Sequence, residues 1–95
     1  MAIPKSRTRQ IALAKIGHLK HLDQLVNSPD SNIRYNVARS GTDEHRDKLI
    51  DDPQWLVRYA VAENGSKKHV EKLSNDKRFS VKMAADRRLK QLGET

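Results

Sequence analysis

The chain has 95 residues, a formal net charge of +7 and a pI near 10, and it contains no cysteine. This length suits one small domain with a thin core, and the missing cysteine excludes disulfides, thiolate catalysis and cysteine-bound metal clusters. No apolar run approaches the roughly 20 residues of a membrane span and residues 1–10 lack the apolar stretch of a secretory signal, so we expect a cytoplasmic protein with no membrane partner.

The first twenty residues divide into a basic arm and half of a repeating unit. Residues 1–8 contain Pro4 and no apolar periodicity, so we predict a loose, flexible arm. From residue 9 the pattern predicts a short helix, because Ile11 to Gly17 align with the second half of each unit that follows. Residues 9–20 therefore form a half repeat, the second helix of a unit without its first helix.

Three blocks of equal length follow and register without a gap, at residues 21–44, 45–68 and 69–92. The positions that coincide carry histidine, leucine, a β-branched residue and a basic residue: His21, His45 and His69; Leu25, Leu49 and Leu73; Ile33, Val57 and Val81; Arg34, Arg58 and Lys82. A fixed period of this length is the signature of repeats that bury their apolar faces only against neighbouring units. We predict an all-α fold, a short α-solenoid of about three and a half 24-residue two-helix repeats, with residues 93–95 as a tail.

Each block predicts two helices, with apolar residues three and four apart on one stripe. The stripe of the first helices comprises Leu22, Leu25, Val26, Leu49, Ile50, Val70 and Leu73, and that of the second helices comprises Ile33, Val37, Val57, Ala60, Val61, Val81, Ala84 and Ala85. We expect both stripes to form the core.

Side-chain caps and glycines mark the predicted helix ends. Ser28-Pro29 and Asp52-Pro53 predict a cap followed by proline at the first helical position, and Asp76 keeps the cap alone. Three glycines predict left-handed stops, followed by Thr42 or Ser66 as the next cap; they are Gly17, Gly41 and Gly65. In the last block we expect the helix to continue to Leu92 and to end at Gly93.

The sequence DPQWLVRYAVAEN at residues 52–64 resembles the leucine-rich repeat variant family, whose repeats read D-P-x-x-x-V-R-x-x-V-A-x-N. The other two units match through Ser28-Pro29, Ile33-Arg34 and Val37-Ala38, and more weakly through Asp76-Lys77, Val81-Lys82 and Ala85. The chain is more distantly similar to HEAT repeats. Both resemblances, over residues 9–92, imply a right-handed helical solenoid used for binding. The iron–sulfur cluster of one leucine-rich repeat variant type sits on cysteines, which this chain lacks, so we expect no cofactor.

The basic position of each unit supports two interpretations. Arg34, Arg58 and Lys82 could form a ladder for phosphates. Alternatively, each pairs with a carboxylate and holds adjacent units together, since Asp52 to Arg58 and Asp76 to Lys82 share a spacing of six. In the first unit Ser28 stands at the acidic position, which leaves Arg34 without an in-register partner, and Asp30 could substitute.

Neither the histidines nor any motif predicts a metal site or an enzyme. Neighbouring helices lie about 8–10 Å apart, so His21, His45 and His69 cannot converge on one ion with ligand distances of about 2 Å. We expect neutral imidazoles near the start of each first helix instead. The chain lacks G-x-S-x-G, P-loop, H-E-x-x-H and dinucleotide motifs, which predicts a protein without catalytic residues.

Tyr35, Arg39, Tyr59 and Glu63 are the candidate partner-binding residues. Tyr35 and Tyr59 share one repeat position beside the basic ladder, where they could anchor a partner or pack between units. Trp55 and Phe79 share another, for which packing is the simpler interpretation. The charge in this register changes from Arg39 to Glu63 and back to Arg87, which suits a protein partner better than a uniformly negative one.

Positive charge at the two ends of the chain makes nucleic acid the alternative predicted partner. Residues 1–20 sum to +5, residues 21–44 to −2, residues 45–68 to +1 and residues 69–95 to +3. The predicted phosphate-binding residues are Lys5, Arg7, Arg9, Lys15, Arg34, Arg58 and Lys82. Basic arms often seek phosphate backbones, but the ends of a solenoid also need charge for solubility.

Overall fold

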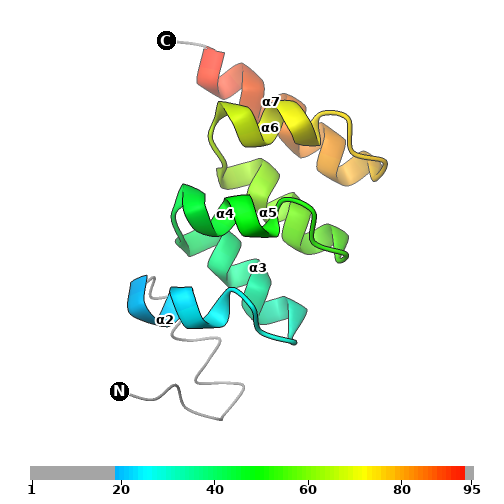
Figure 1. Ribbon diagram of the computed structural model, residues 1–95. Helices are drawn as coiled ribbons and strands as arrows, with labels where there is room; N and C mark the ends of the chain where they lie inside the picture. Colours follow the sequence, from blue (N-terminus) through cyan, green and yellow to red (C-terminus); the bar gives the residue numbers. More distant parts are fainter. Residues whose placement is uncertain (1–18, 94–95) are drawn as a thin grey trace.

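The computed structural model describes residues 19–93, and over this range the chain is helical, without β-strands. The helices are α2 (Leu19–Leu25), α3 (Ser31–Ser40), α4 (Asp43–Leu49), α5 (Trp55–Asn64), α6 (Lys67–Leu73) and α7 (Phe79–Gly93) (Figure 1). Short helices alternate with longer ones, and the expected continuation of the last helix to Gly93 is confirmed. The predicted arm at residues 1–8 and the predicted helix from residue 9 lie outside the described residues.

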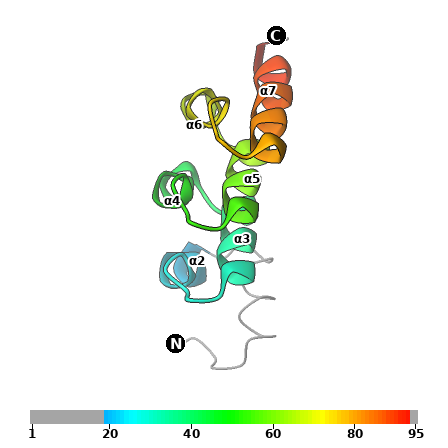
Figure 2. The same cartoon turned by 90° about the vertical axis from the view of Figure 1, so that its right-hand side faces the viewer.

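The helices form two layers (Figure 2). The longer helices α3, α5 and α7 lie side by side in one layer, with α5 packed between the other two. The shorter helices α2, α4 and α6 form the second layer, and each packs against the long helix that follows it. The loops from each short helix to the next long helix lie at one edge of this stack (Figure 1).

The core lies between the two layers and contains the residues that the helical periodicity predicts. Among the predicted stripe residues only Ile50 is half-buried, while the others are buried. Ala38 and Ala62 join this core because small side chains let neighbouring helices approach closely. Buried polar side chains were not predicted as part of it, and within the described range they are Ser28, Asn36, His45, Asp52 and His69. No helix within residues 19–93 has both the length and the apolar character needed to cross a bilayer.

The predicted starts of the long helices are wrong by two positions. The Ser28 hydroxyl accepts from the Asp30 backbone N–H at 3.1 Å, and the Asp52 carboxylate accepts from the Gln54 N–H at 3.0 Å. These oxygens therefore hold the turn before the helix. In α3 the true cap is Asp30, which accepts from the Asn32 N–H at 2.9 Å.

The glycine stops at Gly41 and Gly65 are confirmed, but their left-handed conformation is not. Both residues are extended, with φ of −86° and −75°. Glycine is required there for space, because a Cβ at Gly65 would lie 2.7 Å from the His69 Cβ and 2.7 Å from the Val61 carbonyl oxygen. At Gly41 a Cβ would lie 2.7 Å from the His45 ring. The glycines thus let the next histidine pack against the preceding helix.

Candidate partner-binding surface

Tyr35 and Tyr59 lie at matching positions of the neighbouring helices α3 and α5. Both side chains are half-buried against the core. The guanidinium carbon of Arg39 lies 5.7 Å from the centre of the Tyr35 ring, one helical turn away. This cation–π contact orients the exposed Arg39 side chain along the surface of α3.

A second group of aromatic and cationic side chains joins α5 to the start of α7. The rings of Trp55 and Tyr59 meet edge to face, with centroids 6.2 Å apart. The Arg78 guanidinium lies 4.2 Å from the centre of the Trp55 ring. Trp55 and Phe79 share a repeat position, but Trp55 packs on Arg78 whereas Phe79 is 73% exposed. No sequence signal predicted this role of Arg78, because Asp30 and Gln54 occupy its position in the other units.

At one repeat position of the long-helix layer, the charge changes sign from helix to helix. Arg39 on α3 and Arg87 on α7 are exposed, and the half-buried Glu63 lies on α5 between these helices. All four predicted partner-binding residues therefore belong to α3 and α5, and each helix carries its pair at a spacing of four. A shallow polar hollow beside them is lined by Asn36, Arg39, Ser40 and Asn64.

Arg34 and Arg58 bind carboxylates of the following unit. Arg34 donates to the two Asp52 oxygens at 2.7 and 3.2 Å, and Arg58 donates to those of Asp76 at 2.8 and 3.3 Å. Each guanidinium also donates to a loop carbonyl at 2.7 Å. The partner carboxylate thus lies in the next unit along the chain, and the residue at the predicted spacing of six contributes its backbone oxygen instead.

The expectation that Arg34 lacks an in-register partner is therefore wrong. Its pKa is raised, first by the hydrogen bond to Asp52 and then by the Asp52 and Asp30 charges, against the opposing effect of burial. Burial opposes ionisation of Asp76, but hydrogen bonds from Arg58 and from the Arg78 backbone N–H hold the pKa of Asp76 below its usual value. Only 14% of the Arg34 side chain and 11% of the Arg58 side chain are exposed, so both guanidiniums are committed to these pairs.

Lys82 differs from the two arginines of its repeat position. Its side chain is exposed, and no carboxylate among residues 19–93 pairs with it. Lys5, Arg7, Arg9 and Lys15 lie outside the described residues. Of the predicted phosphate-binding residues within the described range, Lys82 alone presents a free cation.

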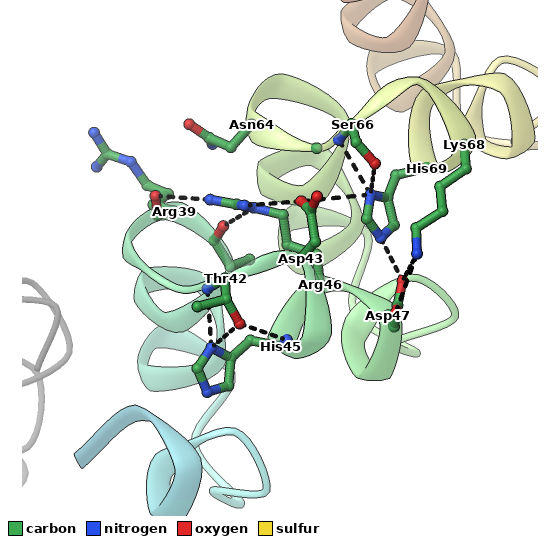
Figure 3. A network of polar contacts seen from close by, with 12 residues as sticks. Arg39, Thr42, Asp43, His45, Arg46, Asp47, Asn64, Ser66, Lys68 and His69 are labelled. Carbon is green, nitrogen blue, oxygen red and sulfur yellow. Dashed lines mark hydrogen bonds and ion pairs between the residues drawn. The ribbon is translucent and has the colours of Figure 1, made fainter. Parts of the chain in front are cut away.

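His45 and His69 lie in the first turn of the short helices α4 and α6, near the helix start as expected, but they are buried and doubly hydrogen-bonded. The Nδ1 atom of His45 accepts from the Thr42 backbone N–H at 2.9 Å, and that of His69 accepts from the Ser66 N–H at 3.1 Å (Figure 3). This arrangement places the ring proton of the neutral imidazole on Nε2.

Each Nε2 atom contacts a carboxylate of the preceding short helix. His45 lies 2.6 Å from Asp23, and His69 lies 2.6 Å from Asp47. The hydrogen bond from His69, and a weaker one from Lys68, lower the pKa of Asp47 despite partial desolvation. These pairs were not predicted from the sequence, although Asp23, Asp47 and Glu71 recur two positions after each histidine.

Further cations of α6 pair with carboxylates of α4 and of the loop that follows it. Lys68 lies 3.3 Å from Asp47, and Lys72 lies 3.0 Å from Asp51. On α4 itself, Arg46 donates to the Ala38 carbonyl at 2.9 Å. It also donates to the Arg39 carbonyl at 3.4 Å and so caps the end of α3 (Figure 3). Much of the positive charge of the described units is therefore balanced or used within the fold. Within residues 19–93 no group of three or more candidate ligands could hold a metal ion.

No family model matches the chain, and neither a curated protein nor a solved structure matches it.

Proposed function

We propose that this chain is a non-enzymatic protein-binding module, a short right-handed α-solenoid of the leucine-rich repeat variant or HEAT-like kind. It acts as an adaptor, regulator or inhibitor by occupying the surface of another protein. The stacked helix pairs, and the inter-unit contacts that recur at the same position of successive repeats, support the solenoid interpretation.

The observation that carries the proposal is the aromatic and cationic surface of α3 and α5. Tyr35 and Tyr59 offer large rings with polar tips, and the adjacent Arg39 is held in place by the Tyr35 ring. Tyrosine and arginine are enriched at protein interfaces and among the residues that contribute most of the binding energy.

The ion pairs formed by the arginines of the repeat, Arg34 and Arg58, also favour a protein partner. Arg34 and Arg58 have carboxylate partners and little exposure, so they are poor phosphate ligands. At one repeat position of the long helices the charge alternates in sign, from Arg39 to Glu63 to Arg87. A phosphate backbone favours a continuous positive track instead.

Substitution of the two tyrosines tests this surface. We expect Tyr35→Ala with Tyr59→Ala to abolish capture of a cross-linked partner, and Arg39→Glu to weaken it at least about tenfold, since charged anchors contribute on that scale. The melting curve of Arg39→Glu should match that of the unmodified protein, as should that of the matched control Gln24→Ala with Asn75→Ala. Unchanged capture by both surface variants would contradict the assignment.

Nucleic-acid binding is the second candidate, and charge at the two chain ends favours it. Residues 1–20 hold five basic and no acidic residues, and α7 exposes Lys82, Arg87 and Lys90. In that case binding depends on the basic arm and on these α7 cations rather than on Arg34 and Arg58.

A further inference from the structure

Several polar contacts join the helix pair α4–α5 to the next pair, α6–α7, and four of them occupy positions that recur in the repeat. On the short helices, Asp47 accepts from His69 and Lys68. On the long helices, Arg58 binds Asp76, and Trp55 packs under Arg78. One side of this junction thus supplies a carboxylate, a guanidinium and an aromatic ring, and the other supplies an imidazole, a carboxylate and a guanidinium.

The junction before it uses the same positions. Asp23 contacts His45 and Arg34 binds Asp52, each one full repeat before its counterpart. The aromatic position holds Ser31 in this junction, and the residue that would face it is Gln54 rather than an arginine. Where the aromatic ring is present the next unit carries an arginine, and where serine replaces the ring the next unit carries glutamine. This covariation between units indicates that the two positions are matched to each other across each junction.

At these same three repeat positions the pair α6–α7 carries a carboxylate, an ammonium group and an aromatic ring, on a face that no described residue covers. Glu71, Lys82 and Phe79 stand one full repeat after Asp47, Arg58 and Trp55. Glu71 is exposed, and among the described residues its carboxylate contacts only Lys67 of its own helix, at 3.8 Å. Lys82 is exposed, Phe79 is 73% exposed, and Met83 next to them is 45% exposed.

We propose that this α7 end face, defined as Glu71, Phe79, Lys82 and Met83, docks a helix pair of a partner chain. The two internal junctions specify what the partner carries. An imidazole near the start of its first helix meets Glu71, a carboxylate seven positions later in its loop meets Lys82, and a guanidinium two positions after that covers Phe79. His69, Asp76 and Arg78 have this spacing.

A second copy of this chain does not offer that pattern in its first complete unit. After His21, the position of the carboxylate holds Ser28 and the position of the guanidinium holds Asp30. The set that has the required spacing, His69, Asp76 and Arg78, is already engaged by Asp47, Arg58 and Trp55 within the same chain. We therefore take the partner to be a different protein with complementary charges.

Lysine in place of arginine gives this face a weaker and more reversible contact. Arg34 and Arg58 hold their carboxylates with two nitrogen atoms each. An ammonium group makes a single charged contact without the planar fork. The bidentate guanidinium suits a permanent junction within the chain, whereas the single contact of an ammonium group suits a surface from which a partner dissociates.

The probe is a fluorescent peptide with the sequence of residues 67–93, which carries the required imidazole, carboxylate and guanidinium. Anisotropy is measured with the full-length protein. We expect binding that Lys82→Glu weakens at least about tenfold, which corresponds to about 1.4 kcal/mol, and that Lys82→Arg strengthens. A peptide with Asp76→Lys should lose affinity for the unmodified protein and regain it for Lys82→Glu.

Three results would overturn the proposal. One is no binding at the highest soluble concentration of a peptide that circular dichroism shows to be helical. Another is binding that ignores Lys82 and responds instead to Arg58→Glu, because the peptide would then displace the α6–α7 pair of the protein itself. The third is a concentration-dependent dimer in light scattering that Lys82→Glu abolishes, which would make a second copy the occupant. Circular dichroism of each variant verifies that it is folded.

Discussion

At the scale of single residues, close contact rather than backbone conformation explains the glycines. Gly41 and Gly65 have ordinary extended φ values, so alanine would be tolerated there if space allowed. The following histidine fills that space and binds both the loop N–H and a carboxylate of the preceding unit. Glycine, histidine and aspartate thus act as one group that sets the spacing between short helices.

Replacement of Gly65 by alanine tests this explanation. The added Cβ would lie 2.7 Å from the His69 Cβ and from the Val61 carbonyl oxygen, so one helix must shift. We expect the free energy of unfolding in urea to fall by about 1–3 kcal/mol, as for other overpacked sites.

Gly93→Ala is the matched control, because a Cβ there meets nothing within 4 Å. This control should be neutral or slightly stabilising, since alanine restricts the unfolded chain. Equal effects of the two substitutions would show that the close approach at Gly65 has no energetic importance.

At the scale of helices, periodicity is sufficient to predict the elements and their core, but not their exact starts. Apolar spacings of three and four place the buried stripe correctly, because a helix must bury one face. The starts differ because Ser28 and Asp52 use their oxygens on the turn two positions ahead. A short motif does not distinguish a capped turn from a capped helix.

Pairing between units follows the same logic. A spacing of six within a unit suggested a local pair, yet the carboxylate that meets Arg58 belongs to Asp76 in the next unit. The guanidinium reaches across to the loop of the next unit because that loop lies directly beside it in the stack. The alignment of the repeats shows that acidic and basic residues recur at fixed positions. The packing of neighbouring units determines which of these residues form ion pairs.

Asp76→Asn measures the strength of such a junction. Its carboxylate accepts from Arg58 and is 7% exposed, so we expect a loss of about 1–3 kcal/mol at pH 7, typical of hydrogen bonds to charged groups. Urea denaturation across pH gives the second readout. The folded pKa of Asp76 is lowered from 3.8, so its contribution is complete above that value and is lost as pH falls through the folded pKa.

The difference between the unmodified protein and Asp76→Asn should therefore close in acid. Glu44→Gln, at an exposed position of α4, is the control and should change stability little at any pH. A difference that stays constant from pH 7 into acid would mean that the Asp76 charge does not stabilise the fold.

At the scale of the whole molecule, the all-helical fold could be read from the sequence, whereas the use of its surface could not. The aromatic cluster depends on Arg78, which only the fold brings over Trp55. Likewise, the arginine ladder looks like a phosphate track in sequence, but its guanidiniums are occupied. Exposure separates binding residues from structural ones, and exposure is a property of the packed helices.

The central claim is that the protein binds another protein, through the surface of α3 and α5, rather than nucleic acid. A fluorescence anisotropy titration with nucleic acids tests this claim most directly. Short single- and double-stranded DNA and RNA are titrated at roughly 50 and 200 mM salt, a range over which phosphate contacts lose affinity by orders of magnitude. We predict no binding or only weak binding at the lower salt concentration. Tight binding that falls steeply with salt, and that weakens when residues 1–8 are deleted, would contradict the claim and establish the basic ends as the functional surface.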